Sequence, residues 1–210
     1  MTARVVPDGP AEREAAAAVL AAGGVVALPT DTVYGIAVAR GTSGGVERLF
    51  EIKRRPPDRA IVLLIDDLEQ VADLVRATPA ARELSGLWPG GLTLVLPEAG
   101  SDGTIAVRLP DHPAPRALAR SVGPLPTTSA NLSGEPEART AAEVVAALGE
   151  GLALVLDGGR SPGGVPSTVV DCSADPVRIL RAGAIPAATI DERLVAAGLG
   201  RSAPAAVVGR

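Results

Sequence analysis

The stretch "VVALPTDTVYGIAVAR", residues 25–40, contains the pattern that decides the fold class. Its first part, "VVALP", is apolar and ends in a proline, which predicts a short buried strand at 25–29. The polar segment "TDTVYG" predicts a loop, and "IAVAR" at 36–40 predicts a second extended segment. A buried strand that ends in a polar loop is therefore the basic unit of this chain.

The same kind of apolar run recurs along the chain, with amphipathic segments between the runs. Further strands are predicted at 61–65, 92–97, 104–110, 125–130, 152–159, 167–172 and 177–183. Helices are predicted at 7–24, 43–55, 66–77, 79–88, 113–122, 140–149 and 189–200. Because strands and helices are interspersed without strict alternation, we expect one α/β domain, residues 8–197, with a mixed parallel and antiparallel sheet flanked by helices. Residues 198–210 are predicted to be a disordered tail.

The composition limits the class of protein. Hydrophobic residues make up 47% of the 210 residues and aromatic residues only 1%, so the core must consist of Val, Leu, Ile and Ala. The single cysteine, Cys172, excludes an internal disulfide and a Cys-rich metal site, and it is expected to be buried. No apolar run reaches the roughly 18 residues of a membrane span, and the N-terminus lacks the apolar core of a signal peptide. We therefore expect a cytoplasmic protein.

The only lysine of the chain, Lys53, lies in its densest basic cluster, "EIKRRPPDRA" at 51–60. The formal net charge is -4 and the isoelectric point is near 5.1, which argues against a broad nucleic-acid surface but not against a local anion site. Taken alone, the cluster fits a solvated helix end as well as a phosphate site.

Polar segments at the strand ends favour the anion site. In an open α/β sheet, ligands bind where such loops gather. Arg108 in "AVRLP" and Arg181 in "ILRAG" both belong to apolar runs. An arginine in such a run either points outward or has an anionic partner. These groups suit a triphosphate or a carboxylate.

The standard catalytic motifs are absent, with one weak exception. The chain contains no P-loop and no G-x-G-x-x-G fingerprint after a strand, and its single histidine, His112, excludes H-E-x-x-H. "GTSGG" at 41–45 fits the G-x-S-x-G nucleophile elbow, with Ser43 as nucleophile and His112 as base. We prefer to interpret it as a helix cap.

Seven segments occur together in one order: "LPTDTVYGIAV", "LFEIKRRP", "WPGGLTLVLP", "TIAVRLPDHP", "TTSANLSGE", "PSTVVD" and "ILRAG". In this order and spacing the chain, from about Asp8 to about Ala197, resembles the YrdC-like family of threonylcarbamoyl-AMP synthases. The resemblance implies a twisted mixed sheet with a central cleft, in the short, single-domain form of the family.

The resemblance also implies a reaction. Members make threonylcarbamoyl-AMP and pyrophosphate from L-threonine, bicarbonate and ATP, and thereby start N6-threonylcarbamoyladenosine (t6A) synthesis on tRNA. Such nucleotidyl transfer needs positioning and positive charge around the phosphate. Mg²⁺ is expected with ATP, without a dedicated protein metal site and without a tightly bound organic cofactor. The expected partner is a downstream tRNA threonylcarbamoyl transferase complex.

By motif match, the resemblance implies the roles of individual residues. Lys53 and Arg55 are the expected catalytic residues. The amino acid threonine is expected to contact Thr32, Arg108, Thr127 and Ser167. ATP is expected to contact Lys53, Arg55, Arg59, Thr104, Ser129, Asn131 and Arg181.

Two positions of this site depart from the family pattern. Arg59-Ala60 replaces a Lys-Pro or Asn-Pro, and Leu64 replaces a histidine that some members place in the threonine pocket. Two alternatives to the synthase therefore remain open. One is an RNA-binding member of the family without synthase activity, and the other is an enzyme that makes a carbamoyl-adenylate for another acceptor.

Overall fold

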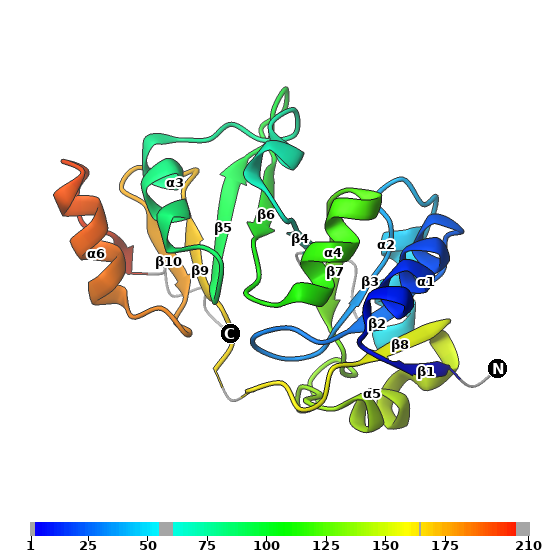
Figure 1. Cartoon of the computed structure of the whole chain (residues 1–210). Helices are drawn as coiled ribbons and strands as arrows, with labels where there is room; N and C mark the ends of the chain where they lie inside the picture. Colours follow the sequence, from blue (N-terminus) through cyan, green and yellow to red (C-terminus); the bar gives the residue numbers. More distant parts are fainter. Residues whose placement is uncertain (1–2, 55–60, 164, 205–210) are drawn as a thin grey trace.

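The computed structural model describes residues 3–54, 61–163 and 165–204. Within these residues eleven strands form one sheet, in the order β1-β8-β2-β3-β7-β4-β6-β5-β9-β10-β11 (Figure 1). The strands are β1 Arg4–Pro7, β2 Val26–Leu28, β3 Gly35–Ala37, β4 Val62–Leu64, β5 Leu92–Pro97, β6 Thr104–Arg108, β7 Leu125–Ser129, β8 Leu154–Asp157, β9 Thr168–Asp171, β10 Arg178–Arg181 and β11 Ala203–Pro204.

Parallel and antiparallel pairs are mixed in this sheet, as the sequence predicts. The parallel pairs are β1–β8, β2–β8, β4–β6, β5–β9 and β10–β11. The antiparallel pairs are β2–β3, β3–β7, β4–β7, β5–β6 and β9–β10. The predicted fold class, an α/β domain with a mixed sheet, is confirmed.

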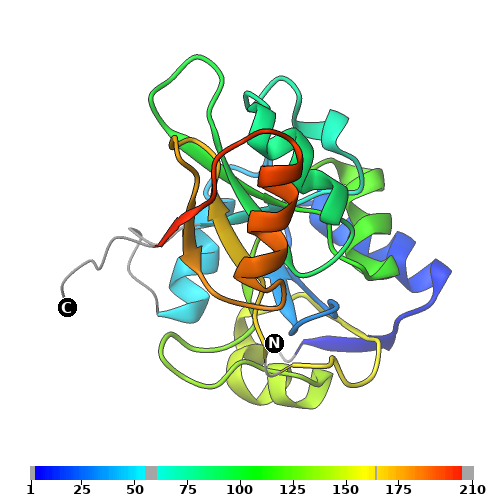
Figure 2. The same cartoon turned by 90° about the vertical axis from the view of Figure 1, so that its left-hand side faces the viewer.

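Six α-helices surround the sheet: α1 Pro10–Ala21, α2 Gly45–Lys53, α3 Pro79–Leu84, α4 Pro113–Val122, α5 Ala141–Leu148 and α6 Ala187–Ala196. α1 and α4 pack on one face of β2 and β3, whereas α2 and α5 pack on the opposite face. α3 and α6 cover β5, β6 and β9 (Figures 1 and 2). The buried hydrophobic side chains are, apart from Tyr34 and Cys172, Ala, Val, Leu and Ile, as the composition predicts.

The helices α3 and α6 cover one face of the central strands, and the site lies on the other face. Leu63, Leu94 and Val107 point into the core beneath α3 and α6. Because successive side chains of a strand point to opposite faces, their neighbours Val62 and Arg108 point away from those helices.

The predicted helix at 66–77 is wrong. Only a 3₁₀ turn forms there, Leu68–Val71, and the side chains of Asp67 and Gln70 close a capping box around it. The N–H of Arg76 then donates to the carbonyl at the end of β5. Polar side chains and the edge of a strand thus take the backbone groups that a longer helix would need.

The described structure extends beyond residues 8–197 at both ends. In β1, Arg4 lies opposite Leu154 of β8, and β11 pairs with β10. The N–H and the hydroxyl of Ser202 both donate to Asp191 of α6. Residues 198–204 are therefore held by backbone and side-chain contacts where a tail was predicted, and 205–210 lie outside the described residues. Strand pairings of this length leave almost no apolar pattern in the sequence from which they could be predicted.

Two predictions from composition can be compared with the structure. Cys172 is buried, and burial raises the pKa of its thiol to about 12. Within the described part of the chain, no helix has the length and apolar character needed to cross a membrane.

Candidate active site

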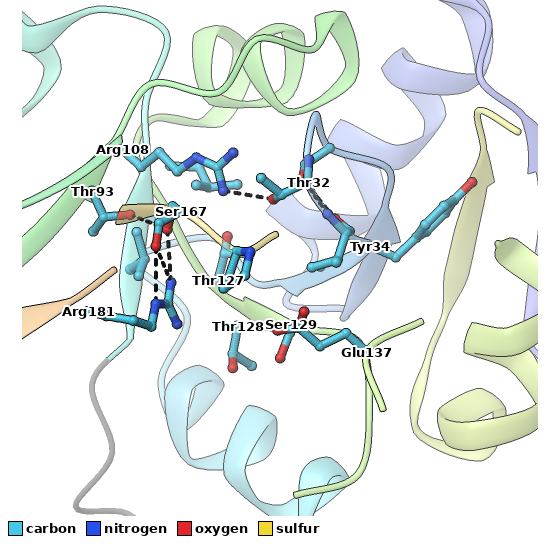
Figure 3. A pocket seen from close by; sticks show the side chains of 16 residues that line it. Thr32, Tyr34, Thr93, Arg108, Thr127, Thr128, Ser129, Glu137, Ser167 and Arg181 are labelled. Atoms are coloured by element: carbon cyan, nitrogen blue, oxygen red, sulfur yellow. Dashed lines mark hydrogen bonds between the residues drawn. The ribbon is translucent and has the colours of Figure 1, made fainter. Parts of the chain in front are cut away.

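A cleft opens on the face of the central strands that α3 and α6 do not cover (Figure 3). Seven strands or their flanking loops contribute to its walls, which combine hydroxyl groups, two arginines and a few apolar side chains. The lining residues are Thr30, Thr32, Val33, Tyr34, Gly35, Val62, Leu64, Thr93, Arg108, Thr127, Thr128, Ser129, Glu137, Pro166, Ser167 and Arg181.

The strand register explains why these residues meet. Thr127 of β7 lies opposite Val62 of β4, which lies opposite Ala106 of β6. Two residues along β4, Leu64 lies opposite Arg108. β4 is thus an apolar strip between a strand of hydroxyl groups and the arginine of β6.

Arg108 is the most enclosed charge of the cleft, with 7% of its surface exposed. Its three guanidinium nitrogens donate to three different residues: Nη2 to Asp31 Oδ1 at 2.8 Å, Nη1 to Thr32 Oγ1 at 3.0 Å and Nε to the carbonyl of Gly90 at 3.0 Å. Burial lowers the pKa of Arg108, and the charge of Asp31 opposes that shift. Of the two alternatives predicted for this arginine, an outward side chain or an anionic partner, the structure shows the second, and the partner is Asp31.

A chain of hydroxyl groups continues from Arg108. Thr32 Oγ1 lies 3.0 Å from Thr30 Oγ1, and the Thr30 hydroxyl donates to the carbonyl of Val33 at 2.6 Å. Since Thr30 has one hydroxyl proton, Thr32 is the donor in the bond between the two. Thr32 Oγ1 therefore accepts from Arg108, donates to Thr30 and keeps one lone pair for a ligand.

The opposite wall contains a second hydroxyl cluster. Ser167 Oγ lies 2.9 Å from Thr93 Oγ1 and accepts from Arg181 Nη2 at 3.0 Å (Figure 3). Arg181 also donates to the carbonyl of Ser167 through Nε and Nη2. Gly183 allows this close approach, because a Cβ there would lie 2.4 Å from the backbone at Pro166 and Ser167.

Lys53 is buried, with 2% of its surface exposed, at the end of α2. Its ammonium group donates to the carbonyl of Ser129, to the carbonyl of Asn131 at 2.7 Å and to Asn131 Oδ1 at 3.0 Å. Ser129 Oγ in turn donates to Asn131 Oδ1 at 2.6 Å. A compact ammonium group suits such converging oxygens better than a planar guanidinium does.

The structure brings most of the predicted site residues together. Six of them line the same cleft: Thr32, Arg108, Thr127, Ser129, Ser167 and Arg181. Lys53 and Asn131 join Ser129 but are not among the lining residues. Thr104 is exposed at the start of β6, four residues or about 13 Å along the strand from Arg108. Arg55 and Arg59 lie outside the described residues.

Sequence reasoning missed several residues of the cleft. Thr93 is a polar residue in the apolar run of β5 and is 1% exposed, so its need for a hydrogen-bond partner was a usable signal. Thr30 and Glu137 lie in loops, and nothing in the sequence marks them. Glu137 is the carboxylate among the lining residues.

The "GTSGG" segment does not form a nucleophile elbow with His112. Ser43 is exposed before α2, and the N-cap of that helix is Gly44. His112 caps α4 instead, since its Nδ1 accepts from the N–H of Ala114 at 3.2 Å. Among the described residues no hydrogen bond joins Ser43 to His112, and the preferred helix-cap role of the Ser43 or Thr42 side chain is wrong as well.

Comparisons with known proteins agree on one family. The model for Sua5, YciO and YrdC proteins, described as telomere recombination, matches residues 18–183. The threonylcarbamoyl-AMP synthase of Bacillus subtilis is 40% identical over 183 residues, which are 81% of this chain and 53% of that protein. The enzyme of the same name from Pyrococcus abyssi is 36% identical over 188 residues, 84% of this chain and 55% of that protein.

Solved structures include close matches to this fold. The crystal structure of P. abyssi Sua5 complexed with L-threonine has a TM-score of 0.85 and 32% identity, and the match covers 97% of this chain and 62% of that one. The present chain thus spans about half the length of the two curated relatives. The family match over residues 18–183 and these identities show that the chain belongs to the Sua5/YciO/YrdC family.

Proposed function

We propose that this protein forms threonylcarbamoyl-AMP from L-threonine, bicarbonate and ATP. The observation that carries the proposal is the buried forked cation of Arg108, which faces a cleft lined with hydroxyl groups from both halves of the sheet. A guanidinium recognises a carboxylate through two parallel hydrogen bonds. The relatives named above add support, since they are called threonylcarbamoyl-AMP synthases and one was solved with L-threonine.

The amino acid would bind at the Arg108 end of the cleft. Its carboxylate would meet the guanidinium, and a donor such as its amine or hydroxyl would meet the free lone pair of Thr32. Thr127 and Ser167 would close the sides. Leu64, opposite Arg108 in the register, would supply an apolar contact for the methyl group.

The nucleotide would lie over the open part of the same face. Arg181 is the exposed cation there and Ser129 the half-buried end of β7, with Thr104 further along β6. Lys53 and Asn131 would act on the nucleotide through the position of Ser129. Arg55 and Arg59 belong to the proposal on motif grounds alone.

The proposed chemistry is nucleotidyl transfer. The threonine amine combines with bicarbonate to give a carbamate and water. A carbamate oxygen then attacks the α-phosphorus of ATP, and the bond to pyrophosphate breaks. Positioning and electrostatic stabilisation are the main contributions that a protein makes to such a step.

Mg²⁺ would accompany ATP and neutralise part of the phosphate charge. Oxygen groups are the ligands that Mg²⁺ prefers, and it keeps several waters. The carboxylate of Glu137 and the hydroxyls of Ser129 and Thr128 line the cleft and fit the shell of a hydrated ion. Among the described residues no three His, Cys, Asp or Glu side chains cluster, so phosphates and water would supply most ligands.

The product is an unstable mixed anhydride, so a second enzyme must use it promptly. We propose that a tRNA threonylcarbamoyl transferase complex takes it for t6A formation, and that the reaction occurs in the cytoplasm. Weak binding of RNA by this protein is the competing proposal, and the charge of -4 counts against it.

Product detection tests the proposal. The purified protein is incubated with Mg-ATP, bicarbonate and L-threonine, and threonylcarbamoyl-AMP is sought by mass spectrometry, with L-serine as a parallel substrate. Product from threonine that disappears in Arg108→Ala supports the proposal. Absence of product from a folded protein that binds ATP contradicts it and directs the search to another amine.

A further inference from the structure

The guanidinium of Arg108 is fixed from three sides. A guanidinium has five N–H groups, and three of them go to Asp31, Thr32 and Gly90. These partners come from the loop between β2 and β3 and from the turn before β5. The two remaining N–H groups are one on Nη1 and one on Nη2.

Asp31 contacts Arg108 without lining the cleft. It is adjacent to the lining residues Thr30 and Thr32 but is not itself one of them. Its side chain is 16% exposed and that of Arg108 is 8% exposed, and the pair is joined at 2.8 Å. Among the described residues this is the one ion pair that Arg108 makes.

We propose that Asp31 is a positioning residue for Arg108, and that its carboxylate directs the two free N–H groups of the guanidinium toward the substrate carboxylate. The proposal rests on the proposed function, since it takes the ligand of Arg108 to be an α-amino acid. Asp31 itself touches no substrate in this scheme.

The need for a carboxylate follows from burial. Without Asp31 the guanidinium would be a buried cation held by two neutral oxygens, and a long side chain with free rotamers would turn toward solvent. The orientation of the fork would then have to be fixed when the ligand binds, at a cost in affinity. A misplacement of about 1 Å is enough to reduce a rate by about 100-fold.

The test compares Asp31→Asn with a matched control. Asp66→Asn is the control because Asp66 is also mostly buried, at 14% exposed, and pairs with Arg116 and Arg120 away from the cleft. Dissociation constants are measured by calorimetry for L-threonine, for L-threoninamide, which lacks the carboxylate, and for ATP.

In Asp31→Asn we expect threonine binding to weaken by about 10- to 100-fold, whereas threoninamide and ATP change by about twofold or less. The preference for threonine over threoninamide should thus be lost in Asp31→Asn, retained in Asp66→Asn and largely recovered in Asp31→Glu. If Asp31→Asn loses stability but retains the preference, Asp31 is only structural and the proposal is wrong.

A second measurement does not depend on any ligand. Restricted rotation of a fixed guanidinium gives separate Nη signals in ¹⁵N NMR, and Arg108→Lys identifies which signals belong to Arg108. We expect separate Arg108 signals in the wild type and averaged signals in Asp31→Asn. Unchanged signals in the variant would overturn the proposal. If these signals behave as expected while the wild type binds no threonine, Asp31 does position Arg108 and it is the proposed function that fails.

Discussion

Arg108 and Lys53, two buried cations of the central sheet region, have different surroundings. Arg108 has a carboxylate partner, faces the cleft and keeps two N–H groups unused by Asp31, Thr32 and Gly90. Lys53 is not among the residues that line the cleft, and its ammonium group donates to oxygens of Ser129 and Asn131.

The comparison distinguishes two roles of a buried cation, which are ligand binding and the support of a loop. A buried cation with an anionic partner can offer its remaining donors to a ligand, because its charge is already balanced. The hydrogen bonds from Lys53 to Ser129 and Asn131 instead tie the end of α2 to the end of β7 and the loop after it. The predictions below test this distinction, from the largest expected effect to the smallest.

Arg108→Lys should have the largest effect, on threonine binding. Lysine retains the charge but not the fork, so we expect affinity to fall about 100-fold, or about 3 kcal/mol. Calorimetric titration measures it, with Arg116→Lys as a control at an arginine outside the cleft. Equal affinity in the two variants would show that the fork is not used.

Lys53→Met should mainly reduce stability. The oxygens of Ser129 and Asn131 lose a charged donor while buried, which should lower the free energy of unfolding by about 3 kcal/mol. Urea denaturation measures it. Arg54→Ala, at the adjacent exposed cation, should change stability by less than about 0.5 kcal/mol.

The variant Lys53→Arg distinguishes a supporting role of Lys53 from a catalytic role. The motif match assigns Lys53 a role near the reacting phosphates, and that role requires a compact ammonium group. We expect slower product formation in the folded variant, measured at saturating ATP. Full activity in Lys53→Arg would leave Lys53 with its supporting role alone.

Gly35→Ala tests how tightly the cleft wall is packed. A Cβ at Gly35 would lie 2.9 Å from the Thr127 methyl and 3.4 Å from the carbonyl of Thr128. Overpacking of this kind costs about 1–3 kcal/mol, and the displaced Thr127 should also weaken threonine binding. Gly41→Ala is the control, since a Cβ there meets no atom within 4 Å.

Tyr34 gives the smallest effect and a pH dependence. Its hydroxyl donates to the carbonyl of Gly159 at 2.7 Å and accepts from the N–H of Gly158 at 3.2 Å, so Tyr34→Phe should cost about 1 kcal/mol. Burial raises the pKa of Tyr34 to about 12. The neutral form is therefore favoured by folding, and its contribution to stability is complete below the ordinary pKa of about 10 and lost as the pH rises toward 12.

Because Tyr34 is the single tyrosine of the chain, its ionisation can be followed by absorbance. Tyrosinate should form near pH 12 or together with unfolding. Ionisation near pH 10 in the folded protein would contradict the buried hydrogen bonds.

The sequence predicted elements well where one apolar run makes one element. β5 Leu92–Pro97 and α4 Pro113–Val122 have the predicted bounds. The segment 66–77 was mispredicted because its helical pattern competes with side-chain caps and with the edge of β5. The cap is local, formed by Asp67 and Gln70, but apolar periodicity does not detect it, and the edge of β5 is distant in the sequence.

The site was predictable from charges in unusual places. Arg108 could be found because a charge in an apolar strand needs a partner, but Asp31 could not, since the loop that carries it lies 77 positions away. The role of Lys53 near the phosphates was predicted from the motif match and stays a prediction. Its hydrogen bonds to the carbonyl oxygens of Ser129 and Asn131 could not be predicted, because every residue type has a carbonyl oxygen.

The pairing of β1 with β8 has a consequence for synthesis on the ribosome. Arg4 lies opposite Leu154, so the edge that β1 completes cannot close until residue 154 has emerged. At the usual elongation rate of 5–20 residues per second, the nascent chain waits roughly 10 to 30 seconds with its first strand unpaired. During that interval β1 and the strands that precede β8 in the sequence are exposed to chaperones. The cleft needs Arg181 of β10 and therefore forms later still.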